Sequence, residues 1–332
     1  MSKTALNGPG RAGAGIPPVP QQAETTLLWI LAIAPETIKS TDEVVSHIIA
    51  PLSAQARIWG AARFGFARGL DESNPQVQLY LVASADVVDH VWKFAHALAE
   101  ECSPHVGTVQ ISQSQPIIIP PPRGEPVPAA LEAMLARYGG VEGIHLMGEV
   151  AELGSELTIW AVNRFPTGSM RSALGALLLF DTCHSMMRGA RSSVWADRRT
   201  VSWDFYWDHY LGGCVESVGL NVEQSRRKLT DRVSPQIAGA HRIMVALASE
   251  PSVESWRKRW VHGIDTYLYR ADRARISRSA QQLAMTQSRQ LLNRLGVTLW
   301  DEAALSLYAR AWSKDLEETP AAKRAGRPAR RP

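Results

Sequence analysis

Two adjoining segments near the C-terminus concentrate side chains that could move protons. Segment 273–295 reads RARISRSAQQLAMTQSRQLLNRL and mixes polar residues with an apolar stripe. Its polar members include Ser279, Gln282, Ser288 and Arg289. Because serine and glutamine are not favoured inside helices, their density predicts one wall of a polar pocket. The alternative is an ordinary exposed helix face.

The preceding segment ends in TYLYR, at 266–270. A buried phenol at Tyr267 could act as a positioned acid in a neighbouring pocket. The alternative is a core tyrosine whose hydroxyl only reaches the rim of the core.

The 11 tryptophans are many for a chain of 332 residues. Trp203 and Trp207 fall in the aromatic segment WDFYWDHY (203–210) and could form a groove wall for flat rings. The alternative is core packing.

Asp204, Asp208 and His209 lie in the same aromatic segment (203–210), but its aromatic content favours packing, so we expect no metal site. No phosphate-binding glycine motif follows a strand, and we expect no cofactor.

Composition excludes several classes of protein. A hydrophobic content of 45% and a charged content of 20% are ordinary for a globular protein. No apolar run approaches the roughly 20 residues of a membrane span, and no signal-peptide pattern opens the chain. Cys102, Cys183 and Cys214 are far apart and odd in number, which favours a reducing cytoplasm. Much of the net charge of +4 lies in the basic tail KRAGRPARRP, so we expect no nucleic-acid partner.

The first part of the chain alternates strand and helix signals. We expect a strand buried on both faces at 25–34, a helix from Ser40 to Gln55, and a strand at 57–68. A strand at 77–83 places Gln78 and Tyr80 on one face. A helix at 86–101 and strands within 106–120 complete a βαββαβ order, the split βαβ pattern.

The remainder is predicted to be mainly helical. Expected helices are 129–138, 141–164, 169–189, 202–211, 221–230, 235–249, 252–270, 273–295 and 300–315. The fold class is therefore α+β, with an α/β sheet region at 23–120 packed against a helical region of the same domain at 121–316. We expect residues 1–22 and the basic tail 317–332 to be disordered.

Three short motifs carry a family resemblance over about 25–297. They are RYGG at 137–140, NPQVQLYL at 74–81 and LLNRLG at 291–296. Together they resemble the small glutamate-elimination domain of lantibiotic dehydratases.

Several charged positions of the eliminating enzymes carry other residues here. Gln78 and Tyr80 stand where those enzymes carry an Arg-x-Arg pair, Met134 where they carry glutamate, and Arg289 where they carry histidine. Arg137, Asn293 and Arg294 are kept. This pattern is similar to that of the thiopeptide pyridine synthases, and the lantibiotic dehydratase elimination-domain-like fold is expected.

The resemblance implies a reaction. The substrate would be a ribosomally made precursor peptide with a leader, bearing azoles and two dehydroalanines. A formal aza-[4+2] cycloaddition would close a macrocycle, and loss of water and of the leader would give a pyridine. For this reaction we expect contact with other biosynthetic enzymes. We expect no contact with nucleic acid or with a membrane.

The resemblance also suggests roles for residues. Tyr267 or Tyr80 would be the acid, and Ser279 or Ser288 would orient the amide. Arg137 and Arg289 would polarise a carbonyl oxygen or hold a leaving hydroxyl. The remaining substrate contacts would come from Gln78, Gln282, Trp203 and Trp207. The leader would bind an exposed sheet edge or a groove beside the helical half.

Two other functions stay open. One is a glutamate-eliminating lyase that forms dehydroamino acids with rearranged catalytic residues. The other is a non-catalytic scaffold that binds the leader and presents the precursor to other enzymes.

Overall fold

The N-terminal third folds into a five-stranded sheet in which every pairing is antiparallel. The computed structural model describes residues 26–69, 71, 73–166, 168–191, 201–217 and 222–317, so the stretch 1–22 and all but the first residue of 317–332 lie outside the described residues. The strands are β1 (Thr26–Pro35), β2 (Arg63–Gly69), β3 (Gln76–Val82), β4 (Val109–Gln113) and β5 (Ile117–Ile119). Their order is β2-β3-β1-β4, with β5 also paired to β1, and the predicted split βαβ pattern is confirmed.

The two faces of the sheet differ. Alternation along the strands sends Leu31, Phe66 and Leu79 to one face, where they pack in a core under the helices that cover it. Ile30 and Tyr80 lie opposite each other on the other face, which is only partly buried. The prediction that β1 is buried on both faces is therefore wrong, because its second face borders a cavity.

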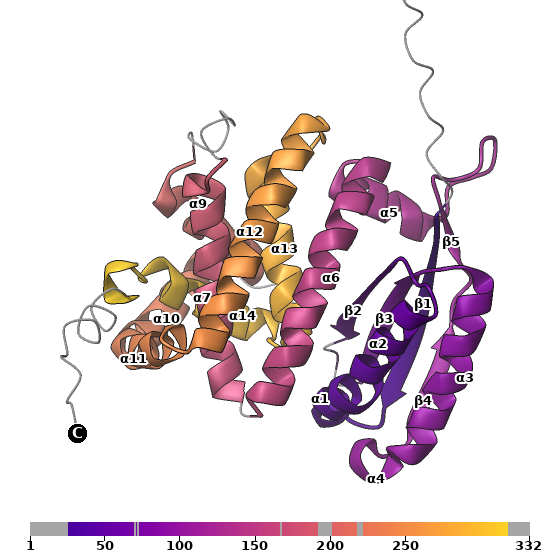
Figure 1. Ribbon diagram of the computed structural model, residues 1–332. Helices are drawn as coiled ribbons and strands as arrows, with labels where there is room; N and C mark the ends of the chain where they lie inside the picture. Colours follow the sequence, from indigo (N-terminus) through magenta and orange to yellow (C-terminus); the bar gives the residue numbers. More distant parts are fainter. Residues whose placement is uncertain are drawn as a thin grey trace, which may run out of the picture.

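Helices cover the first face of the sheet (Figure 1). Between β1 and β2 lie a 3₁₀ turn η1 (Ile38–Ser40), α1 (Thr41–Val44), a π-helical turn η2 (Val45–Ile49) and α2 (Ala50–Ile58). After β3 come α3 (Ala85–Glu101) and α4 (Ser103–Val106).

The strand predicted at 57–68 begins later than expected. Helix α2 continues to Ile58, and Gly60, with φ +102°, ends it. The amide of Ala61 donates to the carbonyl of Ala56 at 2.9 Å, a bond typical of a glycine-terminated helix. The glycine therefore stops the helix rather than continuing a strand.

The helical half is built on a central helix, α7. Its elements are α5 (Ala129–Tyr138), α6 (Val141–Arg164), α7 (Gly168–Arg188), α9 (Trp203–Ser217), α10 (Val222–Val233), α11 (Ile237–Ala248), α12 (Pro251–Arg273), α13 (Ala280–Arg294) and α14 (Leu299–Arg310), with a 3₁₀ turn η4 (Ser234–Gln236) before α11. Helices α11, α12, α13 and α14 all pack on α7, whose Leu174 and Leu177 are fully buried.

The helix predicted at 273–295 begins later than expected, at Ala280. Helix α12 ends at Arg273, a turn passes through Arg275 with φ +52°, and α13 begins after Ser279. Ser279 is the N-cap: its hydroxyl accepts from the amide of Gln282 at 3.2 Å, and the Gln282 side chain accepts from the Ser279 amide at 3.3 Å. This capping box starts α13 seven residues later than the polar pattern had predicted.

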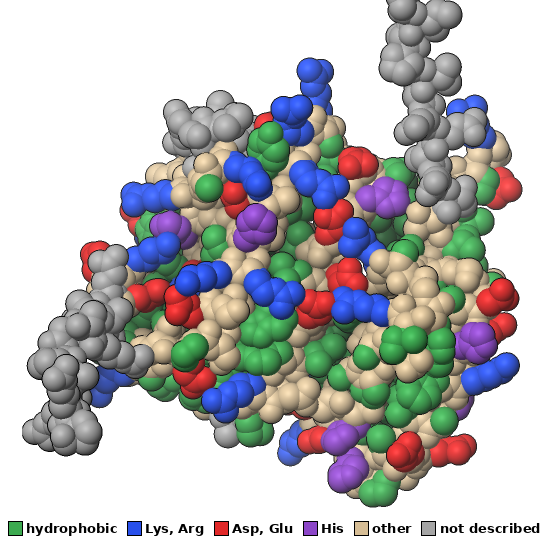
Figure 2. All heavy atoms as spheres, in the orientation of Figure 1, with side chains coloured by type: hydrophobic (Ala, Val, Ile, Leu, Met, Phe, Trp, Pro, Cys, Tyr) green, Lys and Arg blue, Asp and Glu red, His purple; other side chains and the backbone are tan. Residues whose placement is uncertain are grey.

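Helix α6 lies between the sheet and the remaining helices, and its acidic side chains pair with arginines on both sides. The pairs are Glu149 with Arg63 and Arg270, Glu152 with Arg57 and Arg63, and Glu156 with Arg57 and Arg259. In Figure 2, Lys/Arg and Asp/Glu side chains alternate across the middle of the visible face. The ion pairs thus connect the two halves of the molecule along their seam.

Candidate functional site

A cavity of about 920 Å³ lies between the second face of the sheet and helices α5, α6 and α13. Its apolar lining comes from Leu28 and Ile30 of β1, Ile119 of β5 and Met134 of α5. Its polar lining consists of Thr26, Arg63, Arg68, Tyr80, Arg137, Tyr138, His145, Arg289, Gln290, Asn293, Arg294 and Glu302. Apolar walls with a few convergent polar groups are typical of a binding site for a small molecule or a peptide segment.

The RYGG motif forms the turn that brings α5 to this cavity. Gly139 has φ +77°, and its amide donates to the carbonyl of Leu135 at 2.9 Å, which ends α5. Gly140, with φ +106°, precedes the first residue of α6. The turn leaves Arg137 exposed at the cavity rim and buries Tyr138 in the wall.

Tyr80, Tyr138 and Arg294 form the polar centre of the cavity. The Tyr80 hydroxyl donates to Oε1 of Gln78 at 2.7 Å, and the side-chain amide of Gln290 donates to the Tyr138 hydroxyl. Burial raises the pKa of Tyr80, and the nearby charge of Arg294 works against that rise. The Tyr80 phenol therefore stays protonated at neutral pH, as its donated hydrogen bond to Gln78 requires.

Arg294 provides a buried cation at this centre. Its Nε donates to the carbonyl of Phe66 at 2.7 Å, while Nη1 is buried without a hydrogen-bond partner among the described residues. Burial lowers the pKa of Arg294 to about 10, so the guanidinium remains charged at neutral pH. An unpartnered buried donor beside a cavity is suited to a carbonyl or carboxylate oxygen of a ligand.

A buried carboxyl also lines the same cavity. Glu302, on α14, is 2% exposed, and its Oε1 accepts from the Tyr210 hydroxyl at 2.7 Å. Arg289 Nε lies 3.5 Å from the same oxygen. Burial raises the pKa of Glu302, while Tyr210 and Arg289 favour its ionised form. Sequence reasoning missed this residue, because an acid in the first turn of a helix is ordinary on dipole grounds alone.

The structure brings together four of the ten residues predicted for the site. Tyr80, Arg137 and Arg289 line the cavity, and Gln78 is tied to it through the Tyr80 hydroxyl. Ser279 and Gln282 are exposed, and their polar groups are used in the capping box, so the predicted polar wall does not include them. Their polarity sets where α13 begins.

Tyr267 and Ser288 do not line the cavity. Tyr267 is 3% exposed within the helical core, and burial raises its pKa. Ser288 is buried beside Tyr206, because α13 turns its 287–288 side toward the core and its 289–290 side toward the cavity. The structure thus provides the buried phenol at Tyr267 that the sequence predicted, but not in contact with the cavity.

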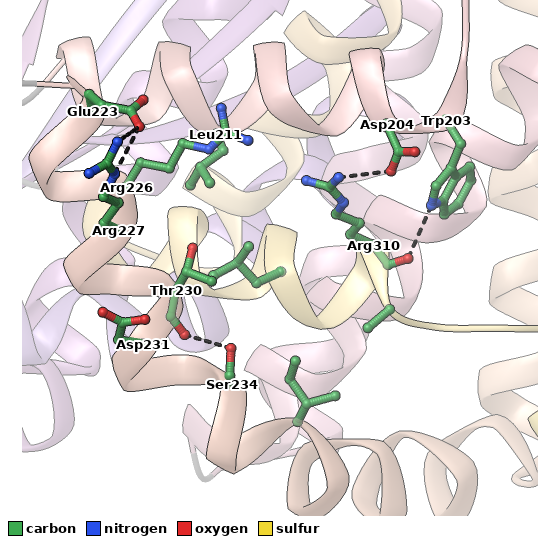
Figure 3. Close-up of a pocket in the computed structure, with 13 residues that line it drawn as sticks. Trp203, Asp204, Leu211, Glu223, Arg226, Arg227, Thr230, Asp231, Ser234 and Arg310 are labelled. Atoms are coloured by element: carbon green, nitrogen blue, oxygen red, sulfur yellow. Dashed lines mark hydrogen bonds and ion pairs between the residues drawn. The ribbon is translucent and has the colours of Figure 1, made fainter.

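The two predicted tryptophans lie elsewhere. Trp207 is 1% exposed and packs in the core against Tyr206. Trp203 borders a second cavity, of about 790 Å³, between α9, α10 and α14, and its Nε1 donates to the Arg310 carbonyl at 3.1 Å (Figure 3). The two rings therefore do not form a wall of the first cavity.

Charged pairs surround the second cavity. Arg310 pairs with Asp204 at 2.8 Å, as Figure 3 shows, and Arg227 pairs with Glu223 at 3.0 Å. Arg226 pairs with Asp208. Because these arginines already have carboxylate partners, the second cavity offers less to a charged ligand than the first.

Two features are absent from the part of the chain that the structure describes. In it, no group of three or more His, Cys, Asp or Glu residues is arranged to hold a metal ion. No helix in it has the length and apolar character needed to cross a membrane.

With this geometry in place, the chain can be assigned to a family. Residues 33–312 match the family described as "Lantibiotic biosynthesis dehydratase C-term", and the chain belongs to it. The chain is thus a domain of the type that forms the C-terminal part of lantibiotic biosynthesis dehydratases. No curated protein sequence matches the chain.

Three solved structures share the fold. The pyridine synthase TbtD from thiomuracin biosynthesis has a TM-score of 0.57 at 15% identity, over 88% of this chain and 99% of TbtD. The tRNA-dependent lantibiotic dehydratase MibB from Microbispora sp. 107891 has a TM-score of 0.56 at 14% identity, over 89% of this chain but only 28% of MibB. TsrL has a TM-score of 0.53 at 13% identity, over 90% of this chain and 99% of TsrL.

Proposed function

We propose that this protein is a pyridine synthase of thiopeptide biosynthesis. Its substrate is a precursor peptide with a leader, azoles and two dehydroalanines. One dehydroalanine and its adjoining amide, as the iminol, form a 2-azadiene, and the second dehydroalanine is the dienophile. The formal aza-[4+2] cycloaddition forms two carbon–carbon bonds, and loss of water and then of the leader as a carboxamide gives the aromatic ring.

The observation that carries the proposal is the neutral wall of the cavity. The Gln78–Tyr80 hydrogen bond of 2.7 Å lies on the sheet face where the eliminating enzymes resembled in sequence carry two arginines. Around it the sheet presents apolar side chains, including Ile30, Val82 and Ile117. Such a wall suits uncharged dehydroalanine and azole groups better than a glutamyl ester.

The reaction needs two distant dehydroalanines held together, and the cavity is large enough for a folded peptide segment. Proximity and orientation can lower a barrier by about 7–11 kcal/mol. Tyr80, Arg137 and Arg289 line this cavity. In the proposed reaction Tyr80 donates its hydroxyl proton to the substrate in place of Gln78, and Arg137 and Arg289 polarise a carbonyl oxygen or hold a leaving hydroxyl. Tyr267, Ser279, Ser288, Gln282, Trp203 and Trp207 are not assigned to this reaction, because they do not line the cavity.

A second function is favoured by a different observation. Arg294, whose Nη1 is buried without a hydrogen-bond partner among the described residues, and Glu302 line the same cavity. A glutamate-eliminating lyase needs a cation for the leaving carboxylate and a base for the α-proton. These two charged groups make the lyase the main rival of the synthase.

Mass spectrometry of the protein incubated with an azole- and dehydroalanine-bearing leader peptide tests the proposal. We expect a free leader carboxamide and a macrocycle that is lighter by this fragment and one water. Release of glutamate from a glutamylated precursor would instead establish the lyase. Tight binding with unchanged mass of both peptides would establish a scaffold.

A further inference from the structure

We propose that Glu302 is the catalytic residue that transfers the amide proton in this cavity, an inference that rests on the proposed pyridine synthesis. Glu302 lines the cavity, comes from α14 and was not singled out by any sequence motif.

The carboxyl is held by one of its two oxygens. Tyr210 Oη donates to Oε1 at 2.7 Å, Cys214 Sγ lies 3.4 Å from Oε1, and Arg289 Nε lies 3.5 Å from it. All three contacts use Oε1, which leaves Oε2 for the cavity that the residue lines. A carboxyl fixed through one oxygen presents the other in a defined direction, as a proton-transfer group requires.

The charged and titratable groups that face this carboxyl come from two helices. Tyr206, Tyr210 and Cys214 face it from α9, and Arg289 faces it from α13. Burial raises the pKa of Glu302, and the hydrogen bond from Tyr210 and the charge of Arg289 oppose that rise. The N-terminus of α14 also favours the anion. These opposing effects suit a group that must both accept and release a proton during the reaction.

The proton step is the conversion of an amide to its iminol. The ionised Oε2 takes the proton from the amide nitrogen and returns it to the amide oxygen. One N–H bond breaks and one O–H bond forms, the C–N bond becomes double, the C–O bond becomes single, and Glu302 ends ionised as it began. No oxidant, reductant or added proton is needed, and Arg289 stabilises the charge on oxygen.

A purely structural carboxyl would behave differently when changed. Glu302→Gln keeps the size and an oxygen acceptor for Tyr210 but cannot carry the proton. We expect kcat for macrocycle formation to fall by about 100- to 10,000-fold, with little change in KM. We also expect the acidic limb of the wild-type pH–rate profile to disappear, because the ionised carboxylate is the active form.

Two further variants separate catalysis from stability. Tyr210→Phe removes a hydrogen bond that favours the ionised carboxylate, so the acidic limb should move to higher pH while the enzyme still turns over. Asp181→Asn removes another buried carboxylate. Asp181 pairs with Arg257 at 2.7 Å and does not line the cavity. This control should lower stability but leave the pH profile unchanged.

The test compares wild type and these variants by mass-spectrometric rates between pH 5 and 9. The inference would be overturned if Glu302→Gln formed the macrocycle at the wild-type rate. It would also be overturned if Tyr210→Phe kept the acidic limb of its pH–rate profile at the wild-type pH. Either result would leave the proposed pyridine synthesis intact. No conversion by the wild-type protein would overturn the proposed function and this inference with it. If Glu302→Gln fails to fold, the position of the acidic limb in the pH–rate profile of Tyr210→Phe decides the test.

Discussion

The side-chain amide of Asn293 pairs with both backbone groups of Arg68, as a neighbouring strand would. Its Oδ1 accepts from the Arg68 amide at 2.9 Å, and its Nδ2 donates to the Arg68 carbonyl at 2.7 Å. Two residues earlier in β2, the amide of Phe66 donates to the hydroxyl of Ser155 at 3.1 Å. Helices α6 and α13 thereby cover the open edge of β2, which removes this edge as a docking strand for a leader peptide.

Asn293→Ala should destabilise the protein by about 2 kcal/mol, because two backbone groups of Arg68 lose their partners in a partly buried setting. Urea unfolding measures the change. Asn163→Ala is the matched control, since Asn163 also lies on a helix but makes one exposed hydrogen bond to the Ile159 carbonyl at 3.0 Å. Equal losses for the two variants would contradict the edge-pairing role of Asn293.

Gly139→Ala should destabilise the protein by at least 1 kcal/mol. Gly139 has φ +77°, and an added Cβ would lie 2.6 Å from Cγ2 of Ile276. Gly239→Ala is the opposite case: Gly239 lies inside α11 with no atom within 4 Å of an added Cβ. We expect this second change to stabilise the protein by up to about 1 kcal/mol in the same unfolding assay. Stability unchanged by Gly139→Ala would show that the turn tolerates a side chain.

Local patterns were sufficient to predict the sheet and most helices. Period-two alternation placed Gln78 and Tyr80 on one face, and their 2.7 Å hydrogen bond confirms that geometry. The glycines of the RYGG motif predicted where α5 ends, at Tyr138. In each case the signal lies within a few residues of the feature that it predicts.

Other features depend on contacts that no local pattern records. The carboxyl of Glu302 accepts a hydrogen bond from Tyr210, which lies 92 residues earlier in the chain. A local sequence pattern therefore does not reveal this pair. The polarity of Ser279 and Gln282 has two physical explanations, a pocket wall or a helix cap, and composition alone does not separate them. The packing of α13 on α7 determines which side of α13 meets the cavity. Ser288 therefore lies on the core side of the helix, although it was predicted to line the site.

His184 should make the protein sensitive to mild acid. Burial, with the nearby charges of Lys314 and Arg188, lowers the pKa of His184 to about 4, from 6.5. Between these two values the unfolded chain binds a proton that the folded protein does not, so stability is lost as the pH falls from 6.5 to 4.

His184→Gln should therefore reduce the acid-induced loss of stability over that pH range, as measured by urea unfolding at several pH values. Lys314→Gln should reduce it less, because burial contributes more than the lysine to the lowered pKa. Partial solvent exposure of the ring makes the effect modest. An identical pH dependence in wild type and His184→Gln would contradict the lowered pKa.

Tyr80→Phe should lower the rate of macrocycle formation while leaving the fold intact. The change removes one hydroxyl, which donates to Gln78 at the cavity surface, and keeps the ring that packs on the sheet. A positioned donor typically contributes about 100-fold or more to a rate. Rates by mass spectrometry, together with thermal unfolding, separate a catalytic loss from a loss of structure.

Tyr267→Phe is the matched control for Tyr80→Phe. Both tyrosines are largely buried and burial raises both pKa values, but only Tyr80 lines the cavity. If access to the cavity decides function, Tyr267→Phe should retain the wild-type rate. A loss confined to Tyr267→Phe would place the reacting atoms on the other side of α13, toward the helical core, and would contradict the assignment of the site to the sheet face.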